Sequence, residues 1–377
     1  MLNLREYAET PVLLADYLPW ACMVAPGVVL NKDGSFQTTF KYRGPDLESS
    51  TEEELVSVMA RVNNVLRRFG SGWALFFEAQ RHEVHDYPEA EFPDALSWLI
   101  DQERALQAEE SGARFESAYY LNLLWLPPAD ATGRAEKALI QRAETEDAAT
   151  WRHRLETFQQ HADRVFDLLS TCLAEIGKLT DDETLTYLHS TISIKRHPVV
   201  TPELPVFLDA VLADEPFAGG LEPMIGDAHL RTLTILGFPA STLPGILDEL
   251  NRQGFAYRWA TRFIAMDKAE AEKVLGKKRR HWFAKRKSIG AVLRETLFNE
   301  QAALVDNDAD NKAGDADAAL QELGSDLVSY GYVTTTLTLM GASREEVEAR
   351  SRAVERVITG RGFTTIRETL NAVEAWL

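Results

Sequence analysis

The order of strand-like and helix-like segments between residues 230 and 367 limits the fold of this chain more than any other feature. Apolar alternation predicts strands there, and helical spacing of apolar residues predicts the segments between them. The order is strand, helix, strand, a helical hairpin, then strand, helix, strand, which is the split β-α-β (ferredoxin-like) arrangement with an insertion. The expected strands are 230–238, 255–266, 332–340 and 363–367, and the expected helices are 242–252, 268–299, 318–329 and 345–359.

The first half of the chain also mixes strand and helix patterns. An Asp33-Gly34 turn between two strand-like runs predicts a β-hairpin. A helix is expected after Thr51, because the spacing of Thr51 to Glu54 fits a capping box. The other expected elements are a strand at 73–80, a helix at 93–109 with Leu96, Leu99, Ile100 and Leu106 inward, a strand at 117–126, a long helix ended by Gly177 and a helix at 182–190.

A proline-rich, irregular stretch from 198 to 223 separates the two halves and places a domain boundary within 175–225. We therefore expect an α+β protein with two mixed α/β subdomains. The predicted division is 1–175 as an N-terminal subdomain ending in a long helix, 176–225 as a linker, and 226–377 as the ferredoxin-like subdomain with helical insertion 268–330.

Charge and motif searches exclude several classes of protein. The formal net charge of −18 argues against a generally basic nucleic-acid binder. No run of about 20 apolar residues is present to span a bilayer. Cys22 and Cys172 are far apart and are expected to pack as small apolar side chains. Neither Gly177-Lys178 nor Gly276-Lys277 fits a phosphate-binding P-loop, so no catalytic or cofactor-binding residue is predicted in this chain.

A basic patch within the insertion is the strongest electrostatic feature. Its candidate members, which mix cations with an aromatic ring, are Lys277, Lys278, Arg279, Arg280, Trp282, Lys285, Arg286 and Lys287. Such a patch suits a protein partner, an anionic membrane surface or a nucleic-acid backbone. The acidic segment 300–326 offers the alternative that the patch is neutralised internally by a neighbouring helix.

Two weaker patterns concern metal ions. His82, His85 and Asp86 resemble a ligand set, but their spacing does not match a zinc helix, and a solvated loop is the simpler interpretation. Asp306 to Asp317 begins like a calcium loop but lacks the turn glycine and the final glutamate, so an acidic turn is the simpler interpretation. No metal ligand is therefore predicted.

Five runs of sequence resemble the conjugal-transfer ATPases of the CagE/TrbE/VirB family of type IV secretion. They include VLRRFGSGWALFFEAQR, YLHSTISIKRHPVVTPELP and LGFPASTLPGILDELN, and the resemblance extends from Leu4 to the final ETLNAVEAWL. Family members are expected to carry an N-terminal assembly region followed by a motor that holds the P-loop, ATP and Mg²⁺. This chain resembles the first region only, and its apolar end at Trp376-Leu377 is expected to continue into such a motor.

The resemblance implies a non-catalytic docking region at the cytoplasmic face of the bacterial inner membrane. Its implied partners are small inner-membrane secretion subunits and sister ATPase subunits, with an anionic membrane surface as a further contact. The alternative is a nucleic-acid-contacting domain that uses residues 277–294, although nucleic acid is not the partner that the charge balance favours. A third alternative is a metal hydrolase around His82, His85 and Asp86.

Overall fold

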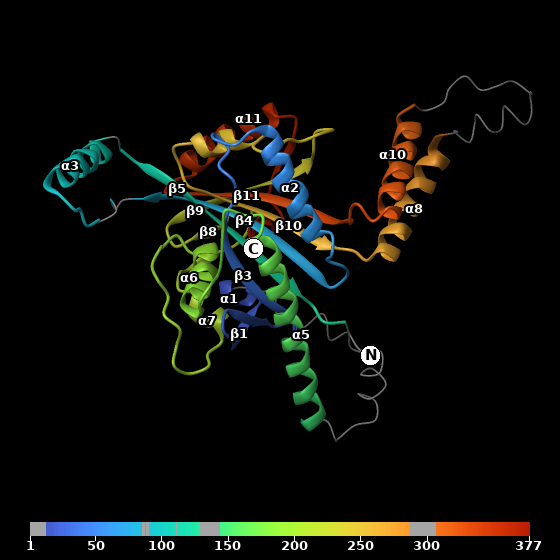
Figure 1. Cartoon of the computed structure of the whole chain (residues 1–377), viewed down its shortest axis with the longest axis horizontal. Helices are drawn as coiled ribbons and strands as arrows, with labels where there is room; N and C mark the ends of the chain where they lie inside the picture. The colour runs from blue at the N-terminus through green and yellow to red at the C-terminus, as the bar shows by residue number, and fades with distance from the viewer. Residues whose placement is uncertain (1–12, 85–86, 88–89, 111, 129–143, 287–306) are drawn as a thin grey trace, which may run out of the picture.

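Twelve strands pair into one continuous sheet in the computed structural model of this chain, and every pairing is antiparallel (Figure 1). The structure describes residues 13–84, 87, 90–110, 112–128, 144–286 and 307–377. Helices pack on this sheet and interrupt two of its hairpins. The predicted α+β class is therefore confirmed.

The first half of the chain forms a unit of four strands and two covering helices, which we name the first unit. Its elements are β3 (Phe36–Arg43), α2 (Glu52–Leu66), β4 (Trp73–Val84), β5 (Arg114–Trp125), α5 (Glu144–Ser170) and β6 (Glu175–Lys178). Their order in the sheet is β6-β3-β5-β4, the split β-α-β order. A helix, α3 (Ala95–Glu110), is inserted between β4 and β5, and the hairpin of β1 (Trp20–Ala25) and β2 (Val28–Asn31) extends the edge of β3.

The second half repeats this arrangement, and we name it the second unit. Its elements are β9 (Ala228–Gly237), the 3-10 helix η2 (Asp248–Arg252), β10 (Tyr257–Ala265), β11 (Gly331–Gly341), α11 (Arg344–Gly360) and β12 (Thr364–Arg367). Their order is β12-β9-β11-β10, as the sequence predicts for a ferredoxin-like unit. Two packed helices, α8 (Lys268–Arg286) and α10 (Asn307–Gly324), are inserted between β10 and β11.

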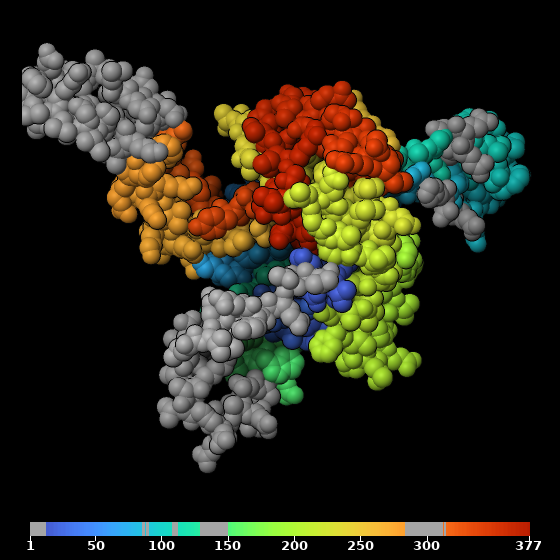
Figure 2. Space-filling view, turned by 180° about the vertical axis from the view of Figure 1, so that it is seen from behind, coloured from blue at the N-terminus to red at the C-terminus, as the bar shows by residue number. Residues whose placement is uncertain are grey.

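The two units join through β4 and β10, a strand pair that we call the seam. The pairing runs from Ala74 opposite Ile264 to Arg81 opposite Tyr257. Because β4 and β10 are the second strands of their units and run antiparallel, an approximate twofold axis perpendicular to the sheet relates the units. Both insertions therefore occupy the same hairpin of their unit. Figures 1 and 2 show α3 and the α8–α10 pair standing off opposite sides of the body.

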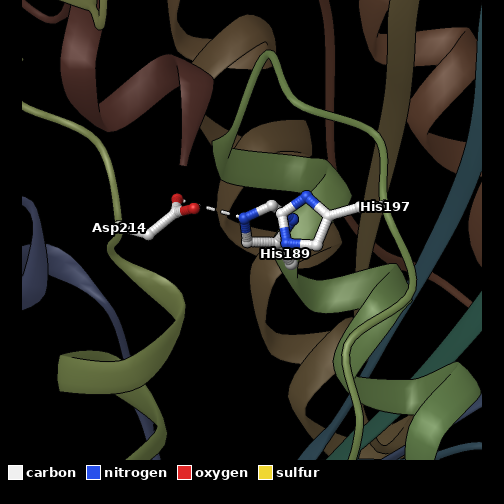
Figure 3. Close-up of side chains that lie close together, drawn as sticks. All are labelled: His189, His197 and Asp214. Carbon is white, nitrogen blue, oxygen red and sulfur yellow. Dashed lines mark hydrogen bonds and ion pairs between the residues drawn. The ribbon is translucent and has the colours of Figure 1, made fainter.

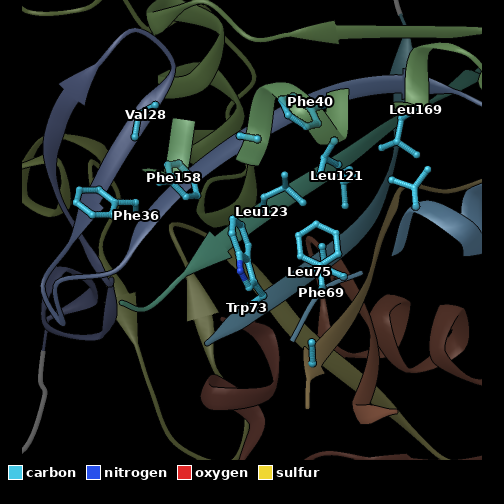
Figure 4. Close-up of a cluster of buried hydrophobic side chains, with 14 of the residues drawn as sticks. Val28, Phe36, Phe40, Phe69, Trp73, Leu75, Leu121, Leu123, Phe158 and Leu169 are labelled. Atoms are coloured by element: carbon cyan, nitrogen blue, oxygen red, sulfur yellow. The ribbon is translucent and has the colours of Figure 1, made fainter. Parts of the chain in front are cut away.

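Helices cover both faces of the sheet. α2, α5 and α11 lie on one face, where Trp73, Leu75 and Phe158 belong to a core of aromatic and branched side chains (Figure 4). The opposite face carries α1 (Leu14–Tyr17), α6 (Asp181–Ile192), α7 (Leu208–Leu212) and α12 (Ala372–Trp376), next to the short strands β7 (Phe217–Ala218) and β8 (Met224–Ile225). Alternate residues of β4 and β10 therefore face two different cores.

Several local predictions are confirmed. Gly34, in the turn between β2 and β3, has φ +85°, a conformation that favours glycine. Thr51 caps α2, and the Thr51 and Glu54 side chains each accept a hydrogen bond from the other residue's backbone N–H. Ser343 caps α11 by accepting from the Glu346 backbone N–H.

Four predictions of helices are wrong in detail. The apolar residues of α3 face solvent, because the helix stands away from the sheet. α5 ends at Ser170, and Gly177 lies instead in β6. The segment 242–252 is helical only as η2, since Pro244 and Gly245, with φ +79°, interrupt the pattern. The acidic segment expected as a turn is helical from Asn307, while residues 287–306 lie outside the described residues.

Candidate functional site

Glu78 and Arg258 meet at the seam between the two units. Arg258 donates two hydrogen bonds of 2.8 Å, from Nε to Oε1 and from Nη2 to Oε2 of Glu78. The Glu78 side chain is only 2% exposed, so neither charge can be removed without leaving the other buried and unpaired. Burial alone lowers the pKa of Arg258, but the charge and hydrogen bonds of Glu78 outweigh burial, and that pKa lies above its usual value.

A layer of side chains from α6 and β4 completes the network. Tyr187 donates from its hydroxyl to Glu78 Oε2 at 3.1 Å, and Gln80 Nε2 donates to Oε1 at 2.6 Å. Burial first, and then the charge of Glu78, raise the pKa of Tyr187 well above its usual value, so this hydroxyl remains a donor. Ser190 and Arg196 donate to Gln80 Oε1 at 3.1 and 3.2 Å, which ties α6 and the chain after it to β4.

The same arginine also holds the last helix, α12. Arg258 Nη1 donates to the carbonyl oxygen of Trp376 at 3.0 Å. The Trp376 side chain is 2% exposed and packs 6.0 Å from the ring of Phe217. One guanidinium group therefore connects the first unit, the second unit and α12, and we name this set of contacts the junction.

Sequence reasoning missed the junction because Glu78 and Arg258 lie 180 residues apart. A weak signal was present, since each is a charged residue inside a predicted strand. The junction offers hydrogen-bonded, buried groups, and its arrangement is suited to holding three elements together rather than to binding a substrate.

The basic patch predicted from the sequence lies on α8. Its described members are the exposed Lys277, Lys278, Arg279 and Arg280, the half-buried Trp282, and Lys285 and Arg286 in the last turn of the helix. Lys287 lies outside the described residues. The patch is therefore a helical surface on the insertion that projects from the body.

One side of this patch faces α10. Arg279 Nη1 lies 2.9 Å from Asp317 Oδ1, and Lys312 Nζ lies 4.6 Å from the centre of the Trp282 ring. Among the residues that the structure describes, Lys277, Lys278 and Arg280 form no ion pair. The patch is thus partly neutralised within the helical pair and partly open to solvent.

The two weaker metal patterns find different surroundings. His82 lies in β4 rather than in a loop, and burial and the charge of Arg196 lower its pKa. His85 and Asp86 lie outside the described residues, so this pattern stays a prediction. From Asn307 to Asp317 the supposed calcium loop is helical, which does not provide the wrapped ligand geometry of such a loop.

α3 presents a large apolar surface to solvent. Its exposed apolar side chains are Leu96, Trp98, Leu99, Ile100 and Leu106, which are 48–66% exposed. The N-terminus of the helix is capped by Asp94, and Tyr87 donates to Asp101 at 2.8 Å. An apolar surface on a projecting helix is typical of a binding site for another protein. No described helix is both long enough and apolar enough to cross a membrane.

Residues 27–133 match a family model described as the N-terminal domain of the type IV secretion system ATPase VirB4/TrbE. The whole chain is 31% identical to a conjugal transfer protein TrbE of Rhizobium radiobacter and covers 47% of that protein. A shorter relative, a probable conjugal transfer protein TrbE of Sinorhizobium fredii, is 35% identical over 148 residues, which make up 38% of this chain and 99% of the relative.

A more distant similarity extends to a second group of secretion proteins. A type IV secretion system protein virB4 of Bartonella henselae is 21% identical over 281 residues, covering 70% of this chain and 35% of the relative. The chain thus spans about half the length, or less, of the full-sized relatives that it matches.

Proposed function

The chain belongs to the VirB4/TrbE family of type IV secretion ATPases, matching their N-terminal domain, and we propose that it is the non-catalytic region that docks such an ATPase onto its secretion apparatus. In this role it couples the ATPase motor to inner-membrane channel and pilus-assembly subunits. Its partners are small inner-membrane secretion subunits and sister ATPase subunits. It works at the cytoplasmic face of the bacterial inner membrane, where an anionic membrane surface is a further contact.

The junction carries the coupling aspect of this proposal. In a longer family member, chain that continues beyond the position of Leu377 leaves directly from α12, which Arg258 holds against the seam. A displacement of α12 would act on β4 and β10 through hydrogen bonds of 2.8–3.0 Å. Such a connection passes motion without any chemistry in this region. ATP and Mg²⁺ would act in the motor, and we propose no cofactor for this chain.

The exposed face of α3 supports the docking aspect. Five large apolar side chains within eleven residues are poorly hydrated, and covering them with a partner would stabilise a complex. Glu103 and Arg104 beside them are exposed and charged, which gives the face a polar border typical of an interface. We assign this face to a secretion subunit.

Expression of the chain in donor cells with a related conjugation system tests docking. The chain should occupy the docking site of the resident ATPase and reduce transfer frequency. The double variant Trp98→Ser/Leu99→Ser should lose this effect, whereas Gln102→Ser on the same helix should keep it. Purified chain should also hydrolyse ATP no faster than buffer. Unchanged transfer with wild-type chain, or clear ATP hydrolysis, would contradict the proposal.

Nucleic-acid contact remains a second candidate, because Lys277, Lys278 and Arg280 are exposed on one projecting helix. Phosphate contacts would make binding of a labelled single strand fall steeply with salt. Reversing these three charges to glutamate should then abolish binding, while Arg279→Glu should have a smaller effect, since Arg279 already pairs with Asp317. Binding that is absent at low salt would exclude this candidate.

A further inference from the structure

Two histidines and an aspartate come together on the face of the molecule that carries α6 and α7 (Figure 3). His189 lies on α6, His197 lies in the chain that follows it, and Asp214 follows α7. His189 Nε2 is 3.1 Å from Asp214 Oδ1, and the rings of His189 and His197 are 4.5 Å apart. One ligand atom from each residue lies within 4.8 Å of the others.

Local hydrogen bonds explain why these residues meet. After α6 the chain turns back along the helix, and two bonds fix it there, from Val199 N to Thr186 Oγ1 at 2.9 Å and from Thr201 N to Asp182 Oδ1 at 2.8 Å. This return places His197 beside His189. The backbone around the cluster is therefore fixed by its own hydrogen bonds.

Asp214 is positioned from its other side. The next residue, Glu215, is buried and accepts hydrogen bonds from Ser193 Oγ at 2.7 Å and from Ile194 N at 3.0 Å. These bonds hold the segment after α7 against the end of α6. The Asp214 carboxylate is thereby held at the buried His189 ring, whose side chain is 3% exposed.

The donor set fits a divalent transition-metal ion. Imidazole nitrogens and a carboxylate are ligands that Zn²⁺ accepts, and metal–ligand bonds of about 2.0–2.2 Å place tetrahedral ligand atoms about 3.3–3.6 Å apart. The 3.1 Å separation of His189 and Asp214 is close to that value. His197 is exposed and can rotate the remaining distance.

The neighbouring cations are directed elsewhere. Lys195 Nζ lies 3.7 Å from Glu215, and Arg196 donates to Gln80. Both basic residues that precede His197 are thus engaged by other partners. A positive ion at the cluster would meet the Asp214 carboxylate and, one residue further, the Glu215 carboxylate.

We propose that His189, His197 and Asp214 bind one Zn²⁺ ion, with water at the fourth position. The ion would bridge α6, the chain that returns along it and the segment after α7. Its role would be that of a clip, because it closes a set of connections that otherwise depends on single hydrogen bonds. The site is separate from the junction and from α3, so it stands or falls independently of the proposed docking function.

Calorimetric titration of the metal-free chain with Zn²⁺ tests the site, with Co²⁺ absorption in the visible range as a report of tetrahedral nitrogen and oxygen ligands. We expect one ion per chain and a higher temperature of unfolding when Zn²⁺ is present. His197→Ala and Asp214→Ala should each weaken binding by about tenfold or more. Both residues are exposed, so these variants should fold.

The matched control is His153→Ala, which removes an exposed histidine on α5 and should leave the affinity unchanged. Circular dichroism checks that each variant is folded. Absence of stoichiometric Zn²⁺ binding would overturn the proposal. Equal affinity of wild type and His197→Ala would also overturn it, because the ion would then be held elsewhere.

Discussion

Arg258 on β10 holds Glu78 on β4 with two hydrogen bonds of 2.8 Å and, through its third nitrogen, also holds the carbonyl oxygen of Trp376. These contacts join two units of the same topology and the last helix at one buried point. The charges are paired, and Tyr187 and Gln80 supply further hydrogen bonds to Glu78. Removing one member of such a pair costs more than the pair itself contributes.

The first prediction concerns this ion pair. Arg258→Ala should lower the free energy of unfolding by about 3–5 kcal/mol, because it leaves the Glu78 carboxylate buried without its counter-charge. The double variant Glu78→Met/Arg258→Met should cost less than Arg258→Ala, since no lone charge remains. Urea unfolding of the three proteins measures both values. A loss below about 1 kcal/mol in Arg258→Ala would place this pair with weak surface pairs.

The second prediction concerns the packing of α12. Trp376→Ala should destabilise the chain by about 3–5 kcal/mol, because a fully buried aromatic side chain is removed. Leu377→Ala, one residue further, should change stability by less than about 0.5 kcal/mol, since Leu377 is exposed. Equal effects of the two substitutions in urea unfolding would show that α12 is not docked as described.

The third prediction separates stability from docking on α3. Trp98→Ser/Leu99→Ser should change the free energy of unfolding by less than about 0.5 kcal/mol per site, because both side chains face solvent. By contrast, Leu121→Ala on β5 should cost about 2–5 kcal/mol, since Leu121 is 2% exposed in the core. Thermal or urea unfolding gives this comparison. A large loss in the α3 variant would mean that its apolar face packs internally.

The fourth prediction concerns alkaline pH. Burial, and then the nearby Tyr119, raise the pKa of Tyr42 to about 12, and burial is also the main cause that raises the pKa of Tyr257 to about 12. Both hydroxyls favour the protonated form in the folded state, so their contribution to stability is complete below about pH 10 and is lost as pH rises through 12.

Absorbance at the tyrosinate band should therefore show a late phase near pH 12 in folded protein. Tyr42→Phe should reduce the amplitude of this phase, and unfolding in denaturant should shift all tyrosine ionisation towards pH 10. A single ionisation near pH 10 in folded protein would contradict the burial of both rings.

The sequence predicted those features of the fold that depend on nearby residues. The Thr51 and Ser343 caps, the hairpin around Gly34 and the strand order of the second unit all follow from local patterns. The helix at 93–109 shows the limit of that reasoning. Its apolar residues have helical spacing, but spacing cannot tell whether the apolar face meets the protein's own core or solvent.

Contacts between distant segments account for what the sequence did not predict. The pairing of β4 with β10, and with it the Glu78–Arg258 pair, depends on two strands 180 residues apart finding the same register. The His189 cluster likewise requires the chain after α6 to fold back along that helix. No spacing rule relates these residues, so only the folded backbone brings them together. The basic patch was the opposite case, since one helix carries all of its described members.

The seam has a mechanical consequence. β4 leads towards α3 at one end, and β10 leads into α8 at the other, only two residues after the strand ends. The two projecting helical insertions are thus handles on one rigid bar of eight paired residues, locked at its middle by Glu78 and Arg258. A partner that grips α3 and one that grips the α8–α10 pair pull on the same bar from opposite ends. Tilting either handle therefore moves the other in the opposite sense about the seam.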